Sequence, residues 1–387
     1  MTANHQGPIS WYDYQPDYND EDEIPDDVKY LRIGFLEHQR FLKGSKESVQ
    51  IELGQNAFYQ HPNLKQVQIF LPAVSRVGAR AFYCCAGLER VEFVMKSPRE
   101  ESEEEQGHDI HLPSQLVSID FEAFCDCENL RSVIGLEHAT ESLTEIGDSA
   151  FDGCTSLNNV DFLPSLRKLQ SLGSFVFHRN TSLTIVDLSK AVCLTELQQS
   201  TFQGCTALVS VRLPPNLLRI GHWSFYCCSE LKEIHIPPRL LSIGKEAFQE
   251  CTKLKFIYLP SSLQQIEESC FWDCTALTQV ALPSSRLPFL KTTPFKASCK
   301  SLSSLDLPNS VSRQQWPLIL EHFCTESGIA KVNGGIENPK NRITIVWNFL
   351  CQNMDQLFIE NNAAALSRRR PAPQLRKLAN QLGCMVK

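Results

Sequence analysis

Residues 254–276 read L-K-F-I-Y-L-P-S-S-L-Q-Q-I-E-E-S-C-F-W-D-C-T-A, and this stretch decides the fold. It opens with the pattern L-x-x-I-x-L, in which Ile257 and Leu259 are two residues apart and therefore point to the same face of an extended strand. Pro260 ends that strand, because proline has no backbone N–H for a sheet ladder. A second segment, L-Q-Q-I, then turns the chain back, and a phenylalanine and a cysteine close the unit from the other side.

The same unit recurs along most of the chain. Its phenylalanine returns every 23–27 residues, apart from one interval of 42 residues. Cysteine follows three residues after the phenylalanine in seven of ten units, although it occupies only about one position in 24 of the whole chain. This phasing marks an internal repeat. The repeat phenylalanines are Phe58, Phe82, Phe124, Phe151, Phe177, Phe202, Phe225, Phe248, Phe271 and Phe295, and the in-phase cysteines are Cys85, Cys127, Cys154, Cys205, Cys228, Cys251 and Cys274.

One such unit has a single apolar layer and cannot bury it alone. Stacked units share one continuous core, so the array extends in one dimension and escapes the size limit of a globular core. The sequence therefore predicts a leucine-rich-repeat solenoid. We expect a right-handed coil with a parallel β-sheet on one face, short turns or a second strand opposite, and a small C-terminal helical cap.

The repeat resembles the bacterial surface protein A-like class of leucine-rich repeats. Residues 219–237 (R-I-G-H-W-S-F-Y-C-C-S-E-L-K-E-I-H-I-P) and 242–260 (S-I-G-K-E-A-F-Q-E-C-T-K-L-K-F-I-Y-L-P) carry the resemblance, which covers about residues 50–308. The segments A-F-Y-Q-H-P-N-L-K-Q-V (57–67) and W-P-L-I-L (316–320) are similar to the diatom members in particular. The resemblance implies an interaction surface and names no specific function.

Composition narrows the class of protein. The 387 residues carry a net charge of −7, and the 16 cysteines, about 4%, are too sparse for a disulfide scaffold. The first residues show no basic and apolar signal-peptide pattern, and no run approaches the length of a membrane span. We therefore expect an intracellular protein with reduced thiols, cytoplasmic in preference to nuclear.

Three regions follow from these patterns. Residues 1–28 contain eight Asp or Glu and no Lys or Arg, which predicts an acidic disordered tail. Residues 29–308 form the solenoid of about ten units, with an acidic insertion at 95–111. Residues 309–387 form a C-terminal region with helical spacing and a basic tail, in which 332–341 reads as a loop. The helical segments lie at 316–324, 343–359 and 367–384.

No pattern in the sequence points to catalysis, a cofactor or a metal. There is no G-x-S-x-G, H-E-x-x-H, phosphate-binding loop or paired C-x-x-C motif. The in-phase cysteines fit a structural role, in which a small thiol fills the coil and can hydrogen-bond the backbone. The out-of-phase cysteines, which are open to packing, exposure or reactivity, are Cys84, Cys125, Cys227 and Cys270.

The strand face supplies the candidate binding residues. On each strand the two variable positions between inward residues point outward, and adjacent strands lie about 5 Å apart. Five such side chains should therefore form one patch: Arg212, Glu233, His235, Phe256 and Tyr258. Aromatic and Arg side chains flanked by polar groups are typical of interface hot spots. The alternative is that cross-strand pairing only stabilises the sheet, or that the C-terminal helices cover the aromatics.

Other features have simpler interpretations. The sequon at Asn180 falls at the cysteine position of its repeat, so its side chain should face inward and escape glycosylation. The basic cluster Arg368–Arg370, with Arg376 and Lys377, could direct nuclear import, or it could be a solvated tail or a partner of the acidic N-terminus. An aromatic ladder directly after the repeat phenylalanines is expected to pack on neighbouring turns; its members are Tyr59, Tyr83, Tyr226 and Trp272.

These observations favour a non-enzymatic scaffold that binds another protein through its strand face. Nucleic acid and membrane are not expected partners, because the chain is net acidic and has no membrane span. Two alternatives stay open: a surface-associated or secreted adhesion protein, and a regulatory subunit directed to the nucleus by its C-terminal basic cluster.

Overall fold

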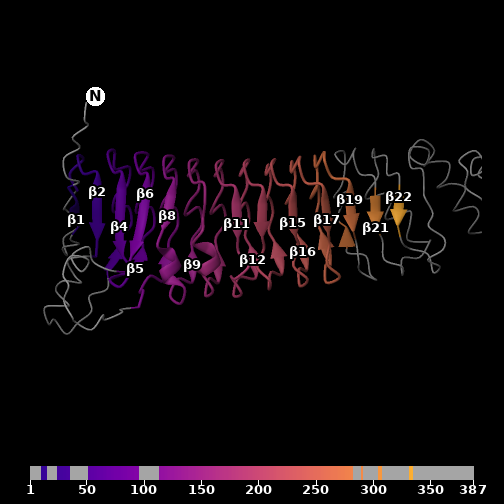
Figure 1. The fold of residues 1–387 in the computed structure, drawn as a ribbon, viewed down its shortest axis with the longest axis horizontal. Helices are drawn as coiled ribbons and strands as arrows, with labels where there is room; N and C mark the ends of the chain where they lie inside the picture. Colours follow the sequence, from indigo (N-terminus) through magenta and orange to yellow (C-terminus); the bar gives the residue numbers. More distant parts are fainter. Residues whose placement is uncertain are drawn as a thin grey trace, which may run out of the picture.

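The computed structural model is an elongated stack of coils (Figure 1). Its strands pair in parallel with the strands of the next coil, and they follow one another in chain order from β1 at one end to β22 at the other. This arrangement confirms the predicted leucine-rich-repeat fold. The structure describes residues 10–14, 24–34, 51–95, 113–281, 289–290, 304–306 and 331–333.

The L-x-x-I-x-L segments form the first sheet, in three successive parts. Inward and outward side chains alternate along each strand: Ile257 is fully buried between Phe256 and Tyr258. The shared face predicted for Ile257 and Leu259 is confirmed, because Leu259 is buried as well. The first part contains β1 (Tyr12–Tyr14), β2 (Tyr30–Ile33), β4 (Gln66–Phe70), β6 (Arg90–Val94) and β8 (Ser132–Ile134). The second contains β11 (Ile185–Asp187), β13 (Ser210–Arg212) and β15 (Glu233–His235), and the third contains β17 (Phe256–Tyr258), β19 (Gln279–Ala281), β21 (Ser304–Asp306) and β22 (Lys331–Asn333).

Short strands from the second half of each coil form a second sheet opposite the first. These strands come from the L-x-x-I segments, so the second strand expected there is present. One part contains β3 (Ile51–Leu53), β5 (Val74–Val77), β7 (Ser118–Ile119), β9 (Glu145–Ile146) and β10 (Ser171–Leu172). The other contains β12 (Glu196–Leu197), β14 (Arg219–Ile220), β16 (Ser242–Ile243), β18 (Gln265–Ile266) and β20 (Phe289–Leu290).

The longer coils depart from the predicted pattern. The repeat pattern places Asn159 and Asp161 at the outward positions of a first-sheet strand, but residues 158–162 form no strand and lead into a 3₁₀ helix, η2 (Leu163–Ser165). Asn and Asp disfavour strands, and Pro164 fits the first turn of a helix. The preceding coil has a similar insertion, η1 (Leu136–Ala139).

Both ends of the array extend further than expected. Residues 1–28 were predicted to be disordered, but β1 lies within them and pairs with β2. Tyr14 packs edge-on against Phe58, with ring centroids 5.1 Å apart, which anchors this strand to the first complete coil. At the other end β22 pairs with β21, although 332–341 was expected to be a loop beyond the last repeat. The predicted C-terminal helices, the basic cluster and the acidic insertion predicted at 95–111, apart from Met95, lie outside the described residues.

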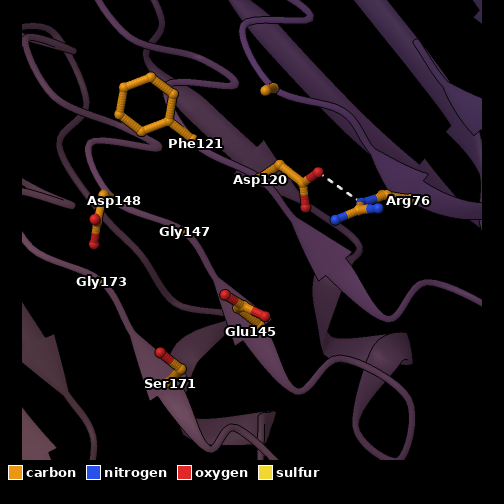
Figure 2. Close-up of a pocket in the computed structure, with 9 residues that line it drawn as sticks. Arg76, Asp120, Phe121, Glu145, Gly147, Asp148, Ser171 and Gly173 are labelled. Atoms are coloured by element: carbon orange, nitrogen blue, oxygen red, sulfur yellow. Dashed lines mark ion pairs between the residues drawn. The ribbon is translucent and has the colours of Figure 1, made fainter. Parts of the chain in front are cut away.

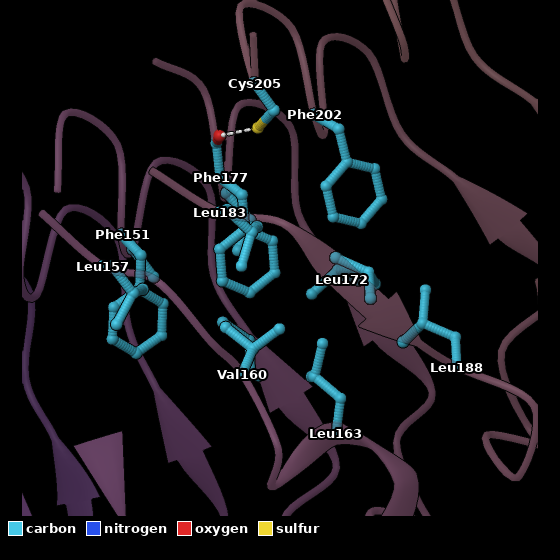
Figure 3. Close-up of a cluster of buried hydrophobic side chains, with 14 of the residues drawn as sticks. Phe151, Leu157, Val160, Leu163, Leu172, Phe177, Leu183, Leu188, Phe202 and Cys205 are labelled. Atoms are coloured by element: carbon cyan, nitrogen blue, oxygen red, sulfur yellow. Dashed lines mark hydrogen bonds between the residues drawn. The ribbon is translucent and has the colours of Figure 1, made fainter. Parts of the chain in front are cut away.

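The repeat phenylalanines form a continuous stack through the core (Figure 3). From Phe58 to Phe271, consecutive ring centroids are 4.9–5.7 Å apart, with interplanar angles of 2–20°. Phe202, Phe225, Phe248 and Phe271 are all completely buried. The coil spacing is therefore filled by one aromatic ring per coil.

Each in-phase cysteine connects its coil to the preceding one. The thiol donates a hydrogen bond to the backbone carbonyl of the previous repeat phenylalanine, with S···O distances of 3.0–3.2 Å, as Cys205 does to Phe177 (Figure 3). Burial raises the pKa of these thiols, for Cys85 to about 12. The expected packing and backbone bonding of these cysteines are thus confirmed.

Asn180 takes the place of a cysteine in this column. Its side chain is completely buried, as predicted, and its Nδ2 donates to the carbonyl of Phe151 at 2.8 Å. Its Oδ1 is buried without a hydrogen-bond partner among the described residues. We expect Asn180→Cys to raise the free energy of unfolding by about 1 kcal/mol, because a thiol keeps the bond to Phe151 and removes the unsatisfied oxygen. Urea unfolding measures this change. Asn180→Ala should lower stability, and an Asn180→Cys protein less stable than the parent would contradict the interpretation.

The turn around each repeat phenylalanine has a left-handed residue on either side. Among the described residues, sixteen non-glycine residues have positive φ, all two positions before or after a repeat phenylalanine; Glu246 (φ 56°) and Glu250 (φ 62°) flank Phe248 in this way. This conformation costs about 1–2 kcal/mol per residue. Hydrogen bonds to the next coil offset the cost: Phe248 N–H, for example, donates to the carbonyl of Cys270 at 2.8 Å.

Glycines after the second-sheet isoleucines allow the coils to approach closely. A Cβ on Gly221 would lie 2.7 Å from the backbone of Leu197 and Gln198, and a Cβ on Gly244 would lie 2.7 Å from Gly221. Neighbouring backbones therefore occupy the space that a side chain would need.

Candidate binding surface

In the N-terminal part of the strand face, polar side chains bind one another across neighbouring strands. Arg32 Nε donates to Gln68 Oε1 at 3.2 Å, and Gln68 Nε2 donates to Glu92 Oε2 at 2.7 Å. Arg90 pairs with the same Glu92, and the Arg32 guanidinium lies 4.8 Å from the ring centroid of Trp11. This polar ladder links the three strands β2, β4 and β6, and Trp11 lies directly before β1.

The middle of the strand face is apolar and exposed. Ile134 on β8 is 37% exposed, and Ile185 on β11 is 62% exposed. Between these strands lies the coil that forms no first-sheet strand, so this part of the face is irregular. On β11, Asp187 accepts a hydrogen bond from Arg212 Nη1 at 3.2 Å.

The five predicted patch residues lie on β13, β15 and β17. Arg212 and His235 are register partners, and the 23-residue period continues that row to Tyr258. Tyr258 is 53% exposed, and its ring centroid lies 5.7 Å from that of the half-buried Phe256. Glu233 and His235 are exposed. Of the five, Arg212 has a charged partner, because its guanidinium pairs with Asp187.

Two lysines at the border of this patch were missed by the sequence analysis. Lys232 and Lys255 directly precede β15 and β17, both are exposed, and Lys255 N–H donates to the carbonyl of Lys232 at 3.3 Å. The sequence does contain a signal for this pair. Both lysines directly follow a repeat leucine, so they occupy the same position in consecutive coils and must lie next to each other. Only the variable positions inside the strands were considered.

The out-of-phase cysteines do not form a reactive centre. Burial raises the pKa of Cys227 to about 11, and its bond to Glu250 Oε2 (3.0 Å) adds to this increase. Burial and then the charge of Asp126 raise the pKa of Cys84. Cys125 and Cys270 are buried. A raised pKa keeps a thiol protonated and weakens it as a nucleophile. Within the described ranges no group of three or more His, Cys, Asp or Glu could hold a metal ion.

A shallow groove on the second-sheet side is a further feature that the sequence did not reveal (Figure 2). Its volume is about 310 Å³, and Gly147 and Gly173 are among its lining residues. At its border Arg76 Nε pairs with Asp120 Oδ2 at 2.6 Å, and Phe121 is 42% exposed. The groove has no enclosed polar group that would fix a ligand. The remaining lining residues are Ala79, Glu145, Asp148 and Ser171.

The aromatic ladder after the repeat phenylalanines is partly exposed. Tyr59 and Tyr83 stack with centroids 5.2 Å apart, which agrees with packing on neighbouring turns. Tyr226 donates to Glu250 Oε1 at 3.2 Å, and Trp272 is 45% exposed.

A family model describes this architecture. The model of the BspA-type leucine-rich-repeat region, in six copies, matches residues 45–103, 103–205 and 195–315. The chain belongs to the BspA-type leucine-rich-repeat family. The resemblance seen in the repeat motif is thereby confirmed, while the similarity to the diatom members stays a prediction. None of the curated proteins matches the chain.

Solved structures of leucine-rich-repeat proteins are similar to this chain, and one of them has a TM-score above 0.5. A leucine-rich repeat protein from Bacteroides ovatus is 24% identical, with a TM-score of 0.52 over 67% of this chain and 59% of that chain. The present chain thus spans about 59% of the length of that protein. A leucine-rich cell surface protein from Faecalibacterium prausnitzii is 21% identical, with a TM-score of 0.33 over 69% of this chain and 84% of that chain. At these identities the likeness concerns the fold alone.

Proposed function

We propose that this BspA-type repeat protein is a non-enzymatic scaffold that binds another protein through its strand face. The observation that carries the proposal is the pair of the half-buried Phe256 and the exposed Tyr258, flanked by Arg212, Glu233 and His235 on two neighbouring strands. Aromatic and Arg side chains within a polar surround are enriched in binding hot spots. A solenoid also offers a long, rigid surface on which several contacts can act together.

We expect Phe256→Ala with Tyr258→Ala to weaken partner capture strongly while leaving the fold intact. Both side chains lie outside the core, and hot-spot truncations commonly cost about 2 kcal/mol or more of binding energy. Affinity capture followed by quantitative mass spectrometry compares the parent, the double variant and a Tyr59→Ala control. Tyr59 is an exposed tyrosine of another face, at 44%. If the double variant recovers as much partner as the parent, the patch is not the binding surface.

We also favour an intracellular location. The described residues contain twelve free cysteines, and the seven in-phase thiols act as hydrogen-bond donors. A column of free thiols in adjacent coils suits a reducing compartment, where disulfides are rare. Within the described residues, no helix has the length and apolar character needed to cross a membrane.

The second candidate is a surface-associated adhesion protein. It is supported by the similar Faecalibacterium prausnitzii protein, which is described as a cell surface protein. Cell fractionation with surface protease treatment separates the two proposals: an intracellular protein resists protease in intact cells, whereas a surface protein is digested. Nuclear direction by Arg368–Arg370 remains an alternative, tested by whether removal of that cluster changes localisation.

A further inference from the structure

The residue directly before each first-sheet strand belongs to a column that runs along one border of the strand face. Backbone hydrogen bonds connect its members from coil to coil, as Glu89 N–H donates to the carbonyl of Lys65 at 2.8 Å and Arg131 N–H to that of Glu89 at 2.9 Å. In these N-terminal coils the column holds Lys29, Lys65, Glu89 and Arg131. Lys65 Nζ pairs with Glu89 Oε1 at 2.9 Å, so Glu89 compensates one of the two adjacent lysines.

Further along the column two like charges follow one another. Lys232 and Lys255 occupy adjacent coils, between the uncharged Val209 and Thr278. Both lysines are exposed, and neither forms an ion pair with any residue that the structure describes. Like charges directly opposite each other on neighbouring strands are unfavourable. This site therefore holds two positive charges that the described part of the fold does not compensate.

These charges border the aromatic pair of the half-buried Phe256 and the exposed Tyr258. Phe256 directly follows Lys255, and Tyr258 lies two residues further along the same strand. Arg212 is already engaged by Asp187, so the two lysines are the available cations of this area. We propose that the strand face at β15 and β17 binds an acidic segment of a partner protein, with its carboxylates on Lys232 and Lys255 and its apolar side chains against the two rings. This inference rests on the proposed use of the strand face.

Nucleic acid fits this surface less well. A nucleic acid places a phosphate at every nucleotide and is held by extended basic stripes. Here two lysines are flanked by Val209 and Thr278, and Glu233 lies on the adjoining strand face. A short peptide in which carboxylates alternate with apolar side chains matches both the charge and the rings.

The test uses the full chain and a fluorescein-labelled peptide in which glutamate and leucine alternate. Fluorescence anisotropy should show saturable binding, and the matched peptide with glutamine in place of glutamate should bind more weakly. Lys255→Glu should weaken binding of the glutamate peptide by about fivefold to tenfold, because one attractive contact becomes repulsive. The thermal midpoint of the Lys255→Glu protein should not fall, because the substitution places a lysine and a glutamate in adjacent coils, as Lys65 and Glu89 are. Lys168→Glu, beside the second sheet, makes the same change in net charge and should leave binding unchanged.

Three results would overturn the inference: no saturable binding of the glutamate peptide, equal binding by Lys255→Glu, or a single-stranded oligodeoxynucleotide that binds as tightly as the peptide. The underlying proposal fails on a different result, namely partner recovery that Phe256→Ala with Tyr258→Ala leaves unchanged, and it can stand when the inference fails. If the glutamine peptide binds as well as the glutamate peptide and Phe256→Ala with Tyr258→Ala weakens both, the strand face remains a binding surface and only its preference for acidic segments is wrong.

Discussion

Replacing Phe248 with alanine is expected to lower the free energy of unfolding by about 3–5 kcal/mol. Phe248 is completely buried, and its ring lies between those of Phe225 and Phe271, with centroid distances of 5.2 and 5.3 Å. Truncation removes one ring from the continuous stack and leaves a cavity between two coils. Because each coil contacts only its neighbours, the loss of structure should be local and centred on the coil that contains residue 248.

Urea unfolding monitored by circular dichroism measures the loss, and hydrogen exchange locates it. The matched control is Trp272→Ala, which removes an aromatic side chain that is 45% exposed in the next coil. Such a surface change should cost less than about 0.5 kcal/mol. If Phe248→Ala and Trp272→Ala were equally stable, the phenylalanine column would not hold the stack together.

Gly221→Ala is expected to lower the free energy of unfolding by about 1–3 kcal/mol, although it adds one methyl group to a position without side chain. The new Cβ would meet backbone atoms of Leu197 and Gln198 at 2.7 Å, and backbone yields less readily than a flexible side chain. The two coils would have to separate. In most exposed settings the same substitution is neutral or stabilising, because alanine restricts the unfolded chain.

Gly54→Ala supplies the matched control for this prediction. A Cβ at Gly54 has no heavy atom within 4 Å among the described residues, so this substitution should leave stability unchanged or raise it slightly. Thermal and urea unfolding of the two variants would be compared directly. Equal stability of Gly221→Ala and Gly54→Ala would show that close approach of the coils does not require glycine.

Most of the fold follows from the sequence because its determinants are periodic. The phenylalanine, cysteine and leucine each return in a fixed phase, so one reading of the unit places all the coils and their inward residues. Asn180 shows the strength of this phase, because an amide at a cysteine position was correctly expected to face inward. The role of the cysteine as a donor to the backbone was also foreseeable from its size and chemistry.

Features without a fixed residue type were missed. The left-handed positions beside each phenylalanine are occupied by glutamate, arginine, serine and even tryptophan at Trp223, so no sequence signal marks them. The absent strand near Asn159 reflects local residue preferences that override the repeat. Strand β22 follows β21 by 27 residues, at the upper end of the repeat interval, but Val332 and Asn333 had been grouped with a loop.

The candidate surface was only partly foreseeable. The five patch residues follow from alternation along a strand, which is a property of one coil at a time. The like-charged pair Lys232 and Lys255 is visible only when consecutive coils are compared, and the groove near Gly147 is lined by residues of several coils. Surface properties of a repeat protein arise between coils, and a single unit does not display them.

The most direct test of the strand face as the binding surface is hydroxyl-radical footprinting of the full chain, alone and with a partner recovered by affinity capture. Tyr258 on the strand face is 53% exposed, while Tyr59 and Trp272 on the phenylalanine-turn side are 44% and 45% exposed and serve as internal references. We predict that the bound partner protects Tyr258 and leaves Tyr59 and Trp272 as reactive as in the free protein. Protection of Tyr59 and Trp272 with unchanged labelling of Tyr258 would contradict the account.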